Sequence, residues 1–130
     1  MEKESGVIAK DILSKRVVSV RKNEKIGESI KTMRKHGYSQ LPVLDRNRVI
    51  GTISEKSILD TVSEGRNLSD ILTKNVESVM TESLPRISED ESIGAVSALL
   101  KNNSAVLVTK KGKIMGIITK TDLFKTVKKK

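Results

Sequence analysis

The pattern with the clearest chemistry in this sequence is Thr119-x-x-Asp122, where a β-branched run gives way to a helical pattern. A Ser or Thr followed three residues later by an acidic residue is typical of a capping box at a helix N-terminus. The same geometry suits a ligand, because a helix N-terminus presents free N–H groups to a phosphate. An Asp in the first turn can also accept both hydroxyls of a ribose. The two interpretations are compatible, since a cap can face a ligand.

The chain repeats itself, and only one copy carries this Asp. The segment 51–59 is echoed 65 positions later by 116–124, and 24–27 is echoed 67 positions later by 91–94. A unit of this length is too long for a solenoid repeat, and two copies are too few for a repeat array. We therefore expect two half-domains that build one core together, with pockets between them.

The two copies differ at the residues that could bind a ligand. The first copy has Ser54 and Ser57 where the second has Thr119 and Asp122. It keeps a possible cap and loses the carboxylate.

The segment 36–42, His-Gly-Tyr-Ser-Gln-Leu-Pro, is the second candidate site. Pro42 lacks a backbone donor and biases the residues before it toward extended conformations, which leaves backbone groups free to read a base edge. Tyr38 is the single Tyr, and a half-buried structural role is the alternative for it. His36 is the single His and is expected at the surface of a helix end; with no Cys and no second His, we expect no transition-metal site.

Composition limits the classes of function. The chain has 130 residues, enough for about one domain, and no Cys, so no disulfide framework or thiolate metal site is available. The net charge of +9 suggests polyanionic partners, although charge dispersed over the surface is the alternative, because three of the cations are the tail 128–130. A surface rich in Lys and Glu also fits a thermophile.

The sequence lacks the motifs of several common activities. We find no Gly-rich phosphate loop, nucleophile elbow or plausible Ser/His/Asp set, so an enzyme is not expected. No apolar run approaches the roughly 20 residues of a membrane span and no signal peptide is recognised, so the expected location is the cytoplasm, without membrane association.

Each copy predicts the order strand, helix, strand, strand, helix. For the first copy the elements are strand 16–20, a helix with Ile26, Ile30 and Met33 that ends at Gly37, strands 41–44 and 49–53, and a helix from about Glu55 to Val62. For the second they are an edge strand 84–87 containing Pro85, a helix with Ile93, Val96 and Leu100 opened by a capping box at 88–91, strands 106–108 and 114–118, and a helix with Leu123, Phe124 and Val127. Residues 69–72 predict a helical turn between the copies. Copy two is two residues shorter between its first helix and second strand, which makes 34–40 a candidate functional loop.

The doubled order, together with the segments 38–45 and 116–123, closely resembles the cystathionine β-synthase (CBS) domain pair, or Bateman module. Residues 76–81 also resemble the segment that leads into a CBS motif. The resemblance divides the chain into a first motif at 7–62, a linker at 63–75, a second motif at 76–127 and a basic tail at 128–130. It implies an α/β fold of two βαββα halves related by a pseudo-twofold axis, assembled as a homodimer.

The family resemblance also implies the ligand and its residues. CBS pairs usually bind adenosine-containing ligands such as AMP, ADP, ATP or S-adenosylmethionine, so no other cofactor is expected. Carried over to this sequence, the residues around adenine are Tyr38, Ser39, Gln40 and Pro42, and those for phosphate and ribose are Thr119, Thr121 and Asp122. A mirror site is doubtful, because Ser57 replaces the Asp and the segment 104–107 lacks the Pro.

The sequence therefore predicts a free-standing sensor of an adenosine nucleotide that acts on an unidentified protein partner. The alternatives are a nucleic-acid-binding module or a protein-interaction module without a small-molecule ligand. One Tyr, one Phe and no Trp argue against binding of single strands by base stacking. A salt-sensitive contact of the basic tail with a nucleic-acid backbone stays open.

Overall fold

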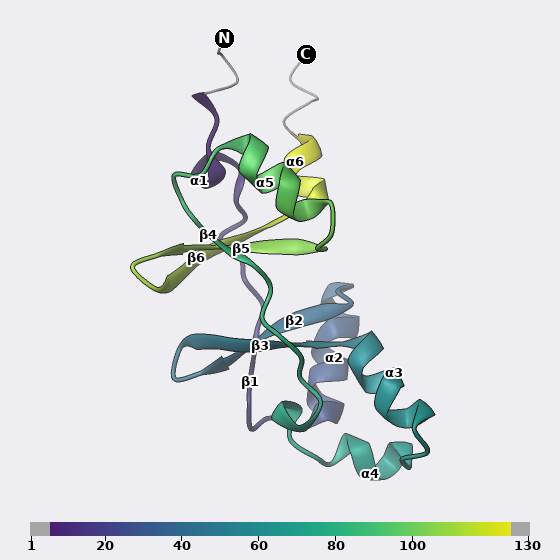
Figure 1. Cartoon of the computed structure of the whole chain (residues 1–130). Helices are drawn as coiled ribbons and strands as arrows, with labels where there is room; N and C mark the ends of the chain where they lie inside the picture. The colour runs from purple at the N-terminus through teal and green to yellow at the C-terminus, as the bar shows by residue number, and fades with distance from the viewer. Residues whose placement is uncertain (1–5, 126–130) are drawn as a thin grey trace. The chain divides into compact units, whose positions relative to one another are not determined.

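The computed structural model describes residues 6–125, and its elements follow the predicted order (Figure 1). After a short helix α1 (Ala9–Ile12), the first copy consists of β1 (Val20–Arg21), α2 (Ile26–His36), β2 (Gln40–Asp45), β3 (Arg48–Ser54) and α3 (Glu55–Ser63). Between the copies are α4 (Leu68–Leu72) and a 3₁₀ turn (Val76–Ser78). The second copy consists of β4 (Arg86–Ser88), α5 (Ile93–Leu100), β5 (Ala105–Lys110), β6 (Lys113–Thr119) and α6 (Lys120–Lys125).

The fold is mixed α/β with two βαββα halves, as predicted. Each half has a three-stranded sheet, of order β1-β2-β3 in one and β4-β5-β6 in the other. The first pair in each sheet is parallel and the second antiparallel. The strand predicted at 84–87 lies at a sheet edge as expected, but it spans Arg86–Ser88, so Pro85 precedes it instead of lying within it.

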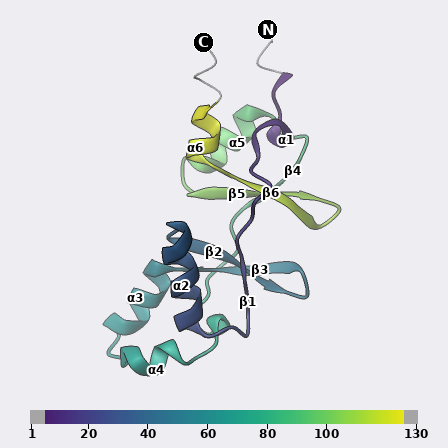
Figure 2. The same ribbon diagram turned by 180° about the vertical axis from the view of Figure 1, so that it is seen from behind.

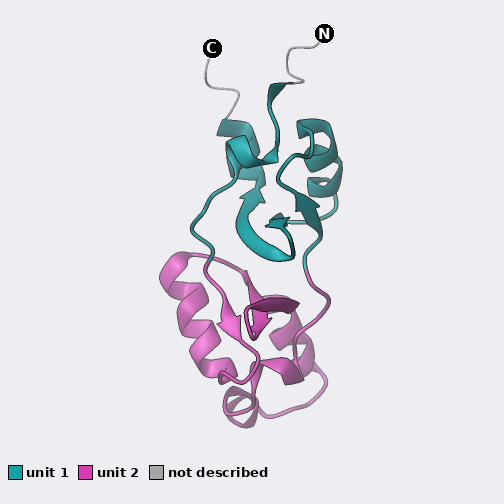
Figure 3. Cartoon of the chain, turned by 90° about the vertical axis from the view of Figure 1, so that its left-hand side faces the viewer, with its two compact units in different colours: residues 1–17, 84–130 teal, residues 18–83 magenta. Residues whose placement is uncertain are grey.

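The chain forms two compact units (Figure 3). Unit 2 is the continuous segment Val18–Ser83, whereas unit 1 combines the chain up to Val17 with the chain from Leu84 onward. The segment before the first copy (residues 6–17) therefore joins the sheet of the second copy, and the segment before the second copy (residues 76–83) joins the sheet of the first. We call these two the leading segments. The repeats of the sequence and the compact units are different divisions of the chain.

Backbone bonds show how these leading segments are held. In unit 1, Ser14 and Ile117 exchange both backbone hydrogen bonds, at 2.8 and 2.9 Å, and the N–H of Ala9 donates to the carbonyl of Glu91. In unit 2, Thr81 and Thr52 exchange theirs at 2.8 and 3.0 Å. A segment remote in sequence thus extends each three-stranded sheet.

One glycine on β3 and one on β6 make this close approach possible. A Cβ at Gly51 would lie 2.7 Å from the Thr81 carbonyl oxygen, and one at Gly116 would lie 2.5 Å from that of Ser14. Both distances are shorter than a side-chain carbon tolerates, so the repeated Gly is a packing requirement at equivalent positions of the two copies.

The core of unit 2 lies between its sheet and its helices. Met33 of α2, Ile58 of α3 and Ile71 of α4 pack with strand residues such as Leu41 and Ile53 in one buried cluster. The helices α2 and α3 lie beside β2 and β3 in both views (Figure 1, Figure 2). The connecting segment is therefore part of the core, and the helical turn predicted there is confirmed as α4.

Unit 1 has its own cluster, built from Val96 and Leu100 of α5, Val106 and Ile118 of the sheet, and Ala9 of the leading segment. The prediction of one shared core was wrong: the described buried residues give two clusters, one in each unit. The reason is that each sheet covers one face with the helices of its own motif, which suffices for a small core.

Two further local predictions need correction. The first strand is only Val20–Arg21, because only these residues pair with β2. The helix α5 is capped by Ser92, whose Oγ accepts the N–H of Ala95 at 3.2 Å, and not by Ser88. Ser88 is the last residue of β4, and its hydroxyl accepts the N–H of Asp90 in a turn. Val127 and the tail 128–130 lie outside the described residues.

The length difference between the copies lies in the first helix. The helix α2 has 11 residues and ends at His36, followed by the C-cap Gly37 with φ of 71°, whereas α5 has eight residues and ends at Leu100. The additional turn of α2 brings Arg34, Lys35 and His36 to the start of the candidate loop.

Candidate functional site

The predicted capping box at the start of α6 is present. The backbone N–H and the hydroxyl of Thr119 both donate to Oδ2 of Asp122, at 2.9 and 3.1 Å. The N–H of Asp122 in turn reaches the Thr119 Oγ1 at 3.4 Å. These contacts fix the rotamer of Asp122, so the carboxylate is held in place before any ligand arrives.

The second oxygen of this carboxylate keeps spare capacity. Its contact within the described residues is a loose ion pair, 3.7 Å between Oδ1 of Asp122 and Nζ of Lys125. The Asp122 side chain is only 11% exposed, while that of Lys125 is 65% exposed. A carboxylate has about four lone-pair sites, so Asp122 can accept the hydroxyl groups of a sugar without losing its cap.

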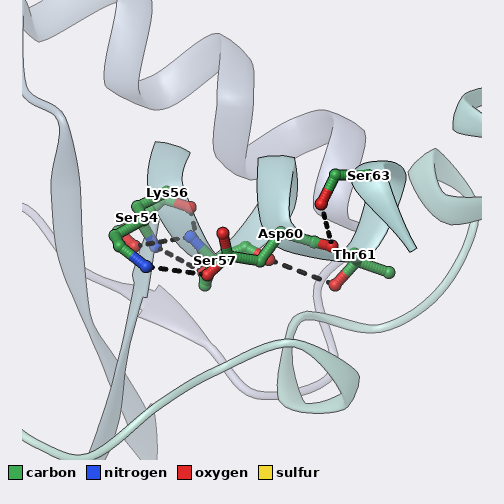
Figure 4. Close-up of polar contacts among 6 residues, drawn as sticks. All are labelled: Ser54, Lys56, Ser57, Asp60, Thr61 and Ser63. Atoms are coloured by element: carbon green, nitrogen blue, oxygen red, sulfur yellow. Dashed lines mark hydrogen bonds and ion pairs between the residues drawn. The ribbon is translucent and has the colours of Figure 1, made fainter.

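The equivalent position in unit 2 is a closed cap (Figure 4). Ser57 Oγ accepts the N–H of Ser54 at 3.1 Å and donates to the Ser54 carbonyl at 3.0 Å, while the N–H of Ser57 donates to Ser54 Oγ. The single hydroxyl hydrogen of Ser57 is used, its side chain is buried and it carries no charge. The first copy thus keeps the cap alone, as the sequence comparison predicted.

The segment that precedes β2 is anchored at both ends. The N–H of Tyr38 donates to the Met33 carbonyl at 2.9 Å, which closes the C-terminus of α2 in the manner of a Schellman motif. The carbonyl of Ser39 accepts the N–H of Glu55 at 3.0 Å, which joins the segment to the start of α3. An irregular connection is thereby held in one conformation.

The aromatic ring of this segment faces solvent. Tyr38 is 42% exposed, so part of its side chain is accessible to a ligand, and the alternative of a half-buried structural tyrosine stays open. Its ring stacks on that of His36, with 5.6 Å between ring centroids and 18° between planes. His36 is the last residue of α2 and is exposed, as predicted. The outer face of such a stacked ring pair is a surface on which a base can stack.

The remaining candidates divide between the units. Gln40 opens β2 opposite Ser54 of β3, and Pro42 is buried in β2 opposite Thr52. The structure therefore brings Tyr38, Ser39, Gln40 and Pro42 together with the Ser54 cap in unit 2. Thr119, Asp122 and the exposed Thr121 belong to unit 1.

Sequence reasoning missed two contacts. The ring stacking of His36 and Tyr38 could have been inferred from a Gly C-cap between two aromatic residues. The contact between Asp122 and Lys125 follows from their (i, i+3) spacing on a helix. Across residues 6–125, the structure contains no group of three or more acidic or His side chains that could hold a metal ion. Nor is any described helix long and apolar enough to cross a membrane.

Comparisons with known proteins identify relatives along nearly the whole chain. The CBS domain family model matches twice, at residues 9–64 and 76–129. An uncharacterized protein of Methanocaldococcus jannaschii is 32% identical over 120 residues, which make up 90% of this chain and 38% of that protein. The chain thus spans well under half the length of this relative.

Solved structures agree with this match. A CBS domain-containing protein of unknown function from Bacillus anthracis str. Ames Ancestor is 26% identical, with a TM-score of 0.85 over 97% of this chain and 96% of that one. The CBS domain pair of protein MJ0100 is 27% identical, with a TM-score of 0.76 over 93% of this chain and 95% of that one. Its crystal structure is a complex with 5′-methylthioadenosine and S-adenosyl-L-methionine.

Proposed function

Because the chain belongs to the CBS domain family and carries two CBS domains, we propose that it is a regulatory module that binds an adenosine-containing ligand. The ligand class is AMP, ADP, ATP or S-adenosylmethionine. The observation that carries the proposal is the pre-oriented Asp122 carboxylate, which has acceptor capacity left after capping α6. The adenosine ligands of the MJ0100 domain pair support the choice of class.

Each candidate residue has a proposed role. Tyr38, Ser39, Gln40 and Pro42 surround the adenine, with the exposed Tyr38 ring as a stacking surface. Thr119 and Thr121 face phosphate or ribose, and Asp122 accepts the ribose hydroxyls. Ser54 and Ser57 would belong to a second site, which we expect to be weak because its cap leaves no acidic group for a ribose.

Regulation requires that the ligand bind two states of the protein with different affinity. We propose that the chain forms a homodimer and passes its state to a protein partner. Leu59 of α3 and Phe124 of α6 occupy equivalent positions in the two copies, and each is 64% exposed, as residues of an interface would be. Light scattering of wild type and Leu59→Glu tests this: a monomeric wild type would contradict the dimer.

A thermal-shift panel tests the proposed ligand class. AMP, ADP, ATP and S-adenosylmethionine are compared with guanosine monophosphate and with inorganic phosphate at the same ionic strength. A ligand present at 100 times its dissociation constant adds about 2.7 kcal/mol to the free energy of unfolding. We expect a rise in Tm with at least one adenosine compound and none with the controls. No rise with any adenosine compound, or an equal rise with guanosine monophosphate, would contradict the proposal.

A further inference from the structure

A concave site lies wholly within unit 2, and no residue proposed above to bind adenosine lines it. It has a volume of about 310 Å³ and lies where β1 ends beside the turn between β2 and β3. We call it the hairpin concavity, and its lining residues are Arg21, Lys22, Asn23, Leu44, Asp45, Arg46 and Asn47.

The backbone explains why these residues meet. Arg21 pairs with Leu44 in the parallel ladder of β1 and β2, and the N–H of Lys22 donates to the Leu44 carbonyl at 3.0 Å. Two residues, Arg46 and Asn47, then turn the chain into β3 with φ of 52° and 67°. Positive φ at both central positions is the pattern of a type I′ turn, which keeps the hairpin short and the turn next to the end of β1.

The lining has an excess of positive charge. It carries three cations and one carboxylate, and that carboxylate is already engaged: Oδ2 of Asp45 lies 3.4 Å from Nζ of Lys22. The nearby Glu24 uses its Oε2 to accept the backbone N–H of Arg21 at 3.0 Å. The guanidinium groups of Arg21 and Arg46 have no ion pair within the described residues.

The second copy offers an internal comparison. There the ion pair has the reverse polarity, with Glu89 after β4 and Lys110 at the end of β5 joined at 3.4 Å. Asp90 stands where the first copy has Asn23, and Lys111 where it has Arg46. Two cations then face two carboxylates, so the excess charge is particular to the first copy and not a property of the repeat.

We propose that the hairpin concavity binds a small phosphorylated anion. Guanidinium groups match the geometry of a phosphate, and the side-chain amides of Asn23 and Asn47 supply further donors. A volume of about 310 Å³ lies at the small end of the range for ligand pockets, which suits a phosphomonoester.

An amide chemical-shift titration of the full chain with glycerol 1-phosphate tests the proposal, with glycerol and sodium chloride at matched ionic strength as controls. Shifts are expected at 21–23 and 44–47. Arg21→Gln combined with Arg46→Gln should weaken binding about tenfold or more. Asp45→Asn should tighten it, because Lys22 is released and the negative charge is removed. Lys111→Gln, at the same turn position in the other copy, is the matched control and should change nothing.

Several outcomes would overturn the proposal: shifts at 88–90 and 109–112 as large as those in the hairpin concavity, weaker binding by Asp45→Asn, or a response to duplex DNA alone. The titration is repeated with Asp122→Ala. Binding at the hairpin concavity that persists in this variant separates it from the adenosine site, so either proposal can fail without the other.

Discussion

At the scale of the residue, the two copies show how one cap geometry leads to different chemistry. Ser57 and Asp122 both face the first turn of a helix and both satisfy the N–H of the residue three positions before them. The Ser57 hydroxyl also donates its only hydrogen to the Ser54 carbonyl, whereas the Asp122 carboxylate retains one oxygen that is held only by a loose ion pair. A single side-chain difference thus leaves an acceptor oxygen at one cap that the other cap lacks.

Substitution of Asp122 separates capping from binding. A hydrogen bond to a charged group contributes roughly 1.5–3 kcal/mol, so Asp122→Ala should weaken adenosine-ligand binding roughly 10- to 150-fold. Asp122→Asn keeps an oxygen for the Thr119 N–H, and should lose nearly as much affinity with a smaller loss of stability. Calorimetric titration and chemical unfolding measure the two effects.

Ser57→Ala is the matched control for these variants. It removes the acceptor of the Ser54 N–H but leaves the N-cap bond from the Ser57 N–H to Ser54 Oγ, so it should lower stability by about 0.5–1.5 kcal/mol with little change in affinity. Equal affinities of wild type and Asp122→Ala would mean that Asp122 is only a helix cap.

At the scale of the element, two glycines allow the leading segments to join the sheets. Gly51→Ala and Gly116→Ala would drive a Cβ into the carbonyl of Thr81 or Ser14, and each should destabilise the protein by roughly 1–3 kcal/mol. Gly94→Ala is the control, because its Cβ would meet only Ser92 Oγ at 3.7 Å within α5. That change should be neutral or stabilising by up to about 1 kcal/mol. Urea unfolding that ranks all three alike would refute the packing argument.

In the hairpin of the second copy, a residue with a long side chain adopts a left-handed backbone conformation that Asn adopts more easily. Lys111 and Gly112 form its turn with φ of 53° and 81°, and a long side chain is disfavoured at such a φ. Lys111→Asn gives the Asn-Gly pair that type I′ turns prefer, and should raise the free energy of unfolding by about 1 kcal/mol or less. Lys113→Asn makes the same chemical change in the strand and should not stabilise. A Tm gain in both variants would point to reduced net charge instead.

At the scale of the whole molecule, the two cores divide the chain differently from the sequence repeat, because the N-terminal segment belongs to the unit of the second copy. The segment 6–17 closes unit 1 through Ala9 and the Ser14–Ile117 bonds. Removal of residues 1–17 should speed amide hydrogen exchange of β6 on the order of tenfold or more, and should leave β2 and β3 nearly unchanged. Equal acceleration in both units would contradict separate cores.

Local patterns determined most of the elements. The helical spacing of Ile26, Ile30 and Met33, followed by Gly37, predicted the helix α2 and its C-terminal end. The β-branched runs predicted the two hairpins. The cap of α5 was misplaced because Ser88 and Ser92 both precede a plausible helix, and only the backbone shows which hydroxyl meets an unpaired N–H. Short edge strands were also misjudged, because pairing and not propensity sets their length.

By itself the sequence determined the duplicated βαββα order, the loss of the carboxylate at Ser57 and the candidate residues around Tyr38 and Asp122, because each depends on residue type and short spacing. Only the tertiary structure decided that each unit has its own core and that each leading segment joins the other copy's sheet. It also decided that Asp122 keeps one oxygen that is held only by a loose ion pair with Lys125. These depend on contacts between residues far apart in the chain and on side-chain direction, which local spacing does not encode.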